Sequence, residues 1–181
     1  NYTVLVIVTF TLASPLAAAQ AGEPVLDAGR QITYHVFMGE LAAERGDGKT
    51  ADKEYLEAAR LSPDPSLASH AAVLAYGAGD DAAALEAARR WQSLVPKDGN
   101  AAQFVAVMDA RLGDVTGAAG GFESLAKVQG GHPYGSDARM LEQETDAAHA
   151  MPVLTRIAAD EMQSSDAHYA LAHAALNYKQ Y

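Results

Sequence analysis

The stretch GDGKTADKEYLEAARLSP, from Gly46 to Pro63, decides the fold because its pattern returns twice along the chain. It returns as GDDAAALEAARRWQSLVP from Gly79 to Pro96 and, without the final proline, as GDVTGAAGGFESLAKV from Gly113. The Gly-Asp step thus recurs after 33 and then 34 residues. A period of this length is typical of stacked helical hairpins. The sequence therefore predicts an all-α repeat array.

Composition excludes several classes of function. The chain is 49% hydrophobic, which favours a folded protein, and it carries 23 acidic against 13 basic residues, a net charge of -10. An acidic surface repels phosphate backbones and anionic lipid, so we expect no nucleic-acid partner. The absence of cysteine excludes disulfides, thiolate catalysis and cysteine-bound zinc.

Residues 2–19 have the composition of an export signal. YTVLVIVTFTLA supplies a short apolar stretch, and SPLAAAQ supplies small residues before a polar one. This pattern predicts a signal peptide at residues 1–19, cut before Gln20, and a linker at 20–26. The mature chain would be periplasmic or outer-membrane associated, without direct insertion into the membrane. The alternatives are a truncated membrane anchor and a buried helix, but the apolar stretch is shorter than the roughly 20 residues that span a bilayer.

Helical periodicity begins after the linker. Asp27 can cap a first helix that ends at Gly46, and a second helix stops at Pro63. We expect a repeat array over residues 27–181, with units at about 32–65, 66–98 and 99–131, a degenerate hairpin at 136–164 and a truncated helix at 166–181. The last helix lacks a partner, so we expect at least another half-repeat in the parent protein.

The degenerate hairpin is the least regular part of this pattern. We expect Ser136 and Asp137 to cap its first helix through their side chains. Thr145 and Asp146 can cap a longer second helix that runs through about Gln163. Pro152 falls inside that run, so it either kinks the helix or places the helix start near Met151.

The small and aromatic residues of these units resemble the tetratricopeptide repeat (TPR), a family of 34-residue helix-turn-helix units. The matching positions are Gly39, Ala51, Tyr55, Ala58 and Pro63 in the first unit, Ala72, Ala84 and Pro96 in the second, and Ala106, Ala118 and Phe122 in the third. The resemblance implies a right-handed superhelix, or α-solenoid, of antiparallel helix pairs. Small residues are needed at Gly39 and Ala51 because the paired helices pack closely. Trp91 departs from the pattern, and we expect it to fill the space where neighbouring repeats meet; the alternative is that it stacks on a ligand.

No constellation of residues points to catalysis. The six histidines are scattered, and His168 and His173 are five residues apart, which differs from the i, i+4 spacing of helical metal ligands. The glycine pairs lack the lysine and strand context of a phosphate loop. We therefore expect no enzyme activity, no metal and no cofactor.

What remains is a binding surface. In a stack of hairpins the first helices line a concave groove. The candidate groove residues are Val36, Glu40, Glu44, His70, Val73, Tyr76, Gln103, Val107, Arg111, Tyr169, His173 and Asn177. Their mixture of apolar and polar side chains suits a protein or peptide ligand. Tyr76 and Arg111 are of the residue types most enriched at interface hot spots.

A second resemblance concerns EYLEAARLSPDPSLASHAAVLAYGAGDDAAALEAARRWQSLVPKDGNAAQ, from Glu54 to Gln103. This run resembles the amino-terminal repeats of Gram-negative outer-membrane lipoprotein adaptors that bind a periplasmic carboxy-terminal processing protease. The shared features are the Asp64-Pro65 step, the acidic Gly-Asp turn and Trp91 with the proline beyond it. The resemblance implies an adaptor that presents substrates to a protease and is not itself hydrolytic.

The sequence departs from such adaptors at the lipid-attachment motif. Leu16-Ala17-Ala18 is followed by Ala19 and not by the cysteine that would carry the acyl chain. Two other functions stay open. The chain could be a structural assembly factor for envelope or pilus machinery, or the non-catalytic repeat region of a larger enzyme.

Overall fold

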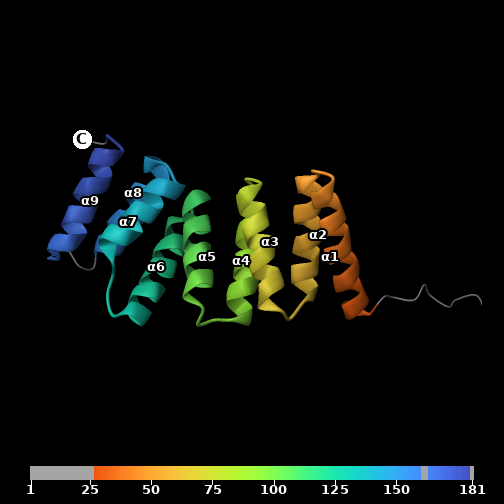
Figure 1. Ribbon diagram of the computed structural model, residues 1–181. Helices are drawn as coiled ribbons and strands as arrows, with labels where there is room; N and C mark the ends of the chain where they lie inside the picture. The colour runs from red at the N-terminus through yellow and green to blue at the C-terminus, as the bar shows by residue number, and fades with distance from the viewer. Residues whose placement is uncertain (1–26, 160–162, 180–181) are drawn as a thin grey trace, which may run out of the picture.

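The computed structural model describes residues 27–159 and 163–179; the predicted signal peptide and linker lie outside these ranges. Within them the chain forms nine α-helices (Figure 1). Their bounds are α1 Ala28–Glu44, α2 Gly48–Leu61, α3 Pro65–Gly77, α4 Asp81–Leu94, α5 Gly99–Arg111, α6 Val115–Gln129, α7 Tyr134–Glu144, α8 Ala147–Ala159 and α9 Ser165–Asn177.

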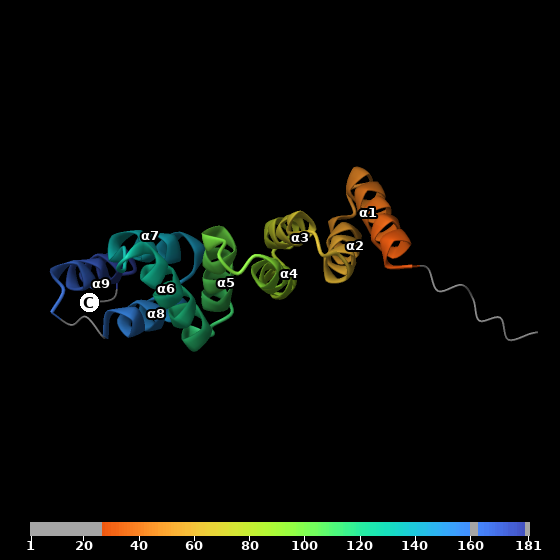
Figure 2. The same cartoon turned by 90° about the horizontal axis from the view of Figure 1, so that it is seen from below.

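The helices follow one another in a row, from α1 at one end to α9 at the other (Figure 1). The pairs α1–α2, α3–α4 and α5–α6 are antiparallel hairpins whose helices contact one another along their length. Seen from below, α1 and α3 lie toward one side of the row and α2 and α4 toward the other (Figure 2). The fourth hairpin is looser, because α7 contacts α9 and α8 contacts α6 more extensively than α7 and α8 contact each other.

The Gly-Asp step that defines the repeat forms the same turn each time. Gly46, Gly79 and Gly113 have φ angles of 73°, 78° and 78°, a left-handed conformation that glycine adopts without strain. The following aspartate donates its backbone N–H to the preceding helix, at 2.9 Å from Asp47 to the Ala42 carbonyl. Its side chain then accepts from the next helix, as in the 3.2 Å bond from the Thr50 amide to Asp47 Oδ1. One dipeptide therefore ends one helix and starts the next.

The small repeat residues lie where the helices touch. Fully buried at these contacts are Ala58, Ala72, Ala84, Ala106 and Ala118, with Gly39, Ala51, Tyr55 and Phe122 also buried. Pro63 and Pro96 lie in the exposed turns after α2 and α4. Methyl-sized side chains allow close approach of the helices, while the aromatic rings fill the remaining space.

Trp91 lies at the junction of the second and third hairpins. It packs against the buried cluster formed by α2, α3, α4 and Val105 of α5, and its ring lies 6.5 Å from that of Phe104 in α5. This is the space-filling role expected from its departure from the repeat pattern.

In the fourth hairpin the structure corrects the predicted cap of the first helix, and it places the start of the second helix at the predicted Asp146 cap. Helix α7 begins at Tyr134, before Ser136 and Asp137, and no side chain caps it. Asp137 is buried inside the helix, and its carboxylate lies 3.6 Å from His132 Nδ1. Its side chain therefore pairs with His132 and does not cap the helix. Helix α8 begins at Ala147, and not near Met151, because the Asp146 carboxylate accepts the His149 amide at 3.0 Å. The helix continues through Pro152, which faces outward.

Candidate functional site

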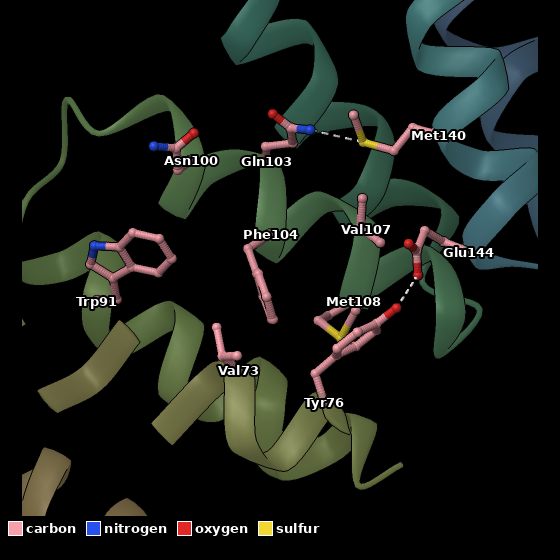
Figure 3. A pocket seen from close by; sticks show the side chains of 10 residues that line it. All are labelled: Val73, Tyr76, Trp91, Asn100, Gln103, Phe104, Val107, Met108, Met140 and Glu144. Atoms are coloured by element: carbon pink, nitrogen blue, oxygen red, sulfur yellow. Dashed lines mark hydrogen bonds between the residues drawn. The ribbon is translucent and has the colours of Figure 1, made fainter. Parts of the chain in front are cut away.

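A pocket of about 330 Å³ lies across the second, third and fourth hairpins (Figure 3). We call it the aromatic pocket. It is lined by Val73, Tyr76, Trp91, Asn100, Gln103, Phe104, Val107, Met108, Met140 and Glu144. These side chains come from α3, α4, α5 and α7, so the pocket exists only when the hairpins stack.

The wall of the aromatic pocket is built around Phe104. Its ring lies between Trp91 and Tyr76, at centroid distances of 6.5 and 5.9 Å, with an edge-to-face arrangement against Tyr76. Met108 is only 1% exposed and forms part of the core beneath, whereas Val73 is 54% exposed. The pocket therefore has a packed apolar base and an open edge, which suits insertion of an apolar group.

Side-chain amides border the same pocket. Asn100 and Gln103 lie on the first turns of α5, and Gln103 Nε2 is 3.2 Å from Met140 Sδ on α7. This contact joins α5 to α7 across the pocket (Figure 3). The oxygen of each amide can accept a hydrogen bond and the nitrogen can donate one.

A polar network closes the other side. Tyr76 donates its hydroxyl to Glu144 Oε2 at 2.7 Å, and this hydrogen bond is the main cause of the raised pKa of Tyr76. Arg111 donates to Asp81 Oδ1 at 2.9 Å and to the Glu144 carbonyl at 3.0 Å. Its guanidinium also lies 5.2 Å from the Tyr76 ring. The bond to Asp81 is the largest contribution to the raised pKa of Arg111. Four elements of the array are thus tied together at this point.

Beyond Glu144 lies a second, polar pocket of about 320 Å³, which we call the acidic pocket. It is lined by Asp81, Arg111, Gln143, Glu144, Thr145, Asp146 and His149. Three carboxylates face one guanidinium there. Glu144 lines both pockets, so the two adjoin.

The structure brings five of the predicted groove residues together. Val73, Tyr76, Gln103 and Val107 line the aromatic pocket, and Arg111 lines the acidic pocket. Tyr76 and Arg111, singled out as hot-spot types, are in direct contact.

The remaining candidates lie elsewhere in the row. Val36, Glu40 and Glu44 are on α1, and His70 is on α3 with its ring 4.8 Å from that of Tyr55. Tyr169, His173 and Asn177 are on α9, where Asn177 Nδ2 donates to Glu142 Oε2 at 2.7 Å. None of these seven lines either pocket.

Apart from Trp91, the predicted groove residues did not include five others that line the aromatic pocket: Asn100, Phe104, Met108, Met140 and Glu144. Met140 and Glu144 are four residues apart and share a face of α7, which is a readable signal. The sequence did not show which partner this face meets, because the 34-residue repeat pattern stops at the glycine-rich turn before α7.

No group of three or more histidine, aspartate or glutamate side chains in residues 27–159 and 163–179 could hold a metal ion. Over the same ranges, no helix has the length and apolar character needed to cross a membrane.

The fold resembles that of a known structure. The crystal structure of the MamA protein, a TPR protein, superposes on this chain with a TM-score of 0.50 at 11% sequence identity, covering 82% of this chain and 83% of that chain. No family model matches the sequence, and no curated protein matches it. The likeness concerns the fold, and it confirms the predicted all-α, TPR-like arrangement of sequential antiparallel helix pairs.

Proposed function

We propose that this protein is an exported scaffold of the bacterial cell envelope that binds a segment of a partner protein. The observation that carries the proposal is the aromatic pocket, an open apolar site assembled from successive repeats. TPR-like folds typically act as non-catalytic scaffolds, and stacked hairpins present extended binding surfaces of this kind.

The partner that we propose is a periplasmic carboxy-terminal processing protease, to which the scaffold presents substrates. The support is the resemblance of residues 54–103 to lipoprotein adaptors of such proteases, together with the export-signal pattern of residues 1–19. In this function the protein supplies binding and positioning, and the protease supplies the hydrolysis.

Site-specific photo-crosslinking in living cells tests this proposal. The full chain is expressed in a Gram-negative host with a photoreactive amino acid at Gln103, in the aromatic pocket, or at Ser124, an exposed residue of α6 that serves as the matched control. We expect an envelope protease to be crosslinked from Gln103 and not from Ser124, as identified by mass spectrometry. Crosslinking to a pilus or secretin component instead would favour the structural assembly role. A chain that remains in the cytoplasm would contradict export.

A further inference from the structure

We infer that the bound segment is an extended peptide that combines a large apolar side chain with a lysine or arginine close to it. The apolar side chain would occupy the aromatic pocket and the cation would lie in the acidic pocket. This inference rests on the proposed function, because it names the chemistry of the segment that the scaffold binds.

The electrostatics of the acidic pocket favour a cation. Asp81, Glu144 and Asp146 supply three carboxylates, and Arg111 is the one guanidinium among the residues that line it. That guanidinium donates to Asp81 Oδ1 and to the Glu144 carbonyl, and it lies 3.6 Å from the Glu144 carboxylate, so its charge is opposed by two carboxylates of the protein itself. The net charge of -10 adds a general repulsion of anions.

Asp146 is the carboxylate best placed to meet a ligand. Its side chain is 68% exposed, although Oδ1 accepts the amide of His149 at 3.0 Å and lies 3.2 Å from His149 Nδ1. The carboxylate keeps acceptor capacity on its second oxygen. An incoming ammonium or guanidinium can therefore bind it without breaking the cap of α8.

The aromatic pocket selects a single large apolar side chain. Its volume, about 330 Å³, is near the lower limit for small-molecule sites, and its wall is formed by Trp91, Phe104 and Tyr76. The rings give offset and edge contacts to another aromatic or to a long aliphatic group. A bulky ligand would have to extend outside the pocket.

The amides beside the pocket favour a peptide. Asn100 and Gln103 can each donate to a backbone carbonyl and accept from a backbone N–H. An extended chain offers both groups at regular spacing, whereas a lipid or a hydrocarbon does not.

The test uses the full chain and a matched set of synthetic peptides. Each peptide has a Ser/Gly backbone with Phe and Lys separated by one, two or three residues, in either order. Control peptides replace Lys by Glu or Phe by Ala. Trp91 is the only tryptophan in the sequence and lines the pocket, so its fluorescence reports occupancy directly.

We expect the best Phe–Lys peptide to bind roughly tenfold more tightly than its Phe–Glu and Ala–Lys counterparts at low salt. The advantage over Phe–Glu should shrink at 0.5 M salt, since it arises from charge. Equal or tighter binding of the Phe–Glu peptide would overturn the inference.

Two isosteric substitutions locate the charge preference. Asp146→Asn keeps the helix cap because asparagine caps as well as aspartate, and Glu144→Gln keeps an acceptor for the Tyr76 hydroxyl. In the double variant the Lys-over-Glu preference should fall to about twofold or less. Glu86→Gln removes a carboxylate that lines neither pocket and should leave the preference unchanged. An unchanged preference in the double variant would contradict the assignment of the acidic pocket.

The crosslinking experiment separates the two levels of the proposal. If Gln103 captures an envelope protein while no Phe–Lys peptide binds, the peptide chemistry is wrong and the scaffold function stands. If neither experiment detects binding at Gln103 or Trp91, both are wrong.

Discussion

Gly39 of α1 packs directly on the ring of Tyr55 in α2. A β-carbon at Gly39 would lie 3.0 Å from Tyr55 Cε2 and 3.1 Å from Cδ2. The ring has little room to move because Tyr55 is only 3% exposed, and burial raises the pKa of its phenol to about 12. The close approach of the first two helices therefore depends on the absence of a side chain at residue 39.

We predict that Gly39→Leu lowers the free energy of unfolding by about 1–3 kcal/mol, because the added side chain must displace Tyr55. Urea unfolding followed by circular dichroism measures the change. The control is Gly120→Leu in α6, where a β-carbon would meet nothing within 4 Å. Gly120→Leu should be neutral or stabilising, since leucine is the better helix former. Equal effects of the two substitutions would contradict this account of the packing.

A neighbouring pair of glycines allows a sharper comparison. A β-carbon at Gly121 would lie 2.7 Å from the β-carbon of Ala106 in α5, whereas Gly120 is open. We predict that Gly121→Ala destabilises the protein by about 1–3 kcal/mol and that Gly120→Ala stabilises it by up to about 1 kcal/mol. The melting temperature of each variant measures this. Combining Gly121→Ala with Ala106→Gly removes the clashing methyl, so the double variant should be less destabilised than the sum of the two single substitutions. Strictly additive effects would rule out the clash as the cause.

The first three hairpins could be predicted because their determinants are local. The turn at Gly46-Asp47 needs only a glycine with positive φ and an aspartate side chain within reach of the next helix. Both are visible in the sequence. They also set the phase of each helix, which is why Val73 and Tyr76, which line the same pocket, could be predicted to share a surface.

The fourth hairpin could not be predicted in the same way because burial, and not residue type or spacing, decides the roles of its side chains. Asp137 has the residue type and spacing of a cap, yet it is buried beside His132, whose ring stacks on Tyr134 at 5.0 Å. A sequence pattern does not show whether an aspartate caps a helix or is buried against a neighbouring side chain, because tertiary packing decides between these two roles. Met140 and Glu144 follow Asp137 on the same helix. Because the repeat pattern does not fix which face of this helix meets α5, their position in the aromatic pocket could not be predicted.

The network around Arg111 should contribute measurably to the stacking of hairpins. Arg111 binds Asp81 of α4 and the last residue of α7, and its side chain is 26% exposed. We predict that Arg111→Met, which keeps the apolar stem and removes the guanidinium, destabilises the protein by about 1–2 kcal/mol, because two partly buried carboxylates lose their counter-charge. Arg60→Met is the matched control, since its ion pairs with Glu57 and Glu86 are more exposed and should cost less than about 1 kcal/mol. A larger loss for Arg60→Met in urea unfolding would show that the Arg111 network does not hold the hairpins together.

The buried carboxylate of Asp137 should make stability depend on pH. The residue is 6% exposed, and burial raises its pKa from 3.8 to about 6 despite the attraction of His132. Between about pH 4 and 6 the folded chain therefore keeps a proton that the unfolded chain has lost, so stability falls as pH rises through this window. We predict that the free energy of unfolding of the wild type, relative to Asp137→Asn, decreases by on the order of 1–3 kcal/mol from pH 4 to pH 6.5. Asp109, whose pKa is also raised by burial, contributes equally to both proteins and cancels in the difference. Parallel pH profiles of the two proteins in urea unfolding would mean that Asp137 is ionised in the folded chain throughout this range.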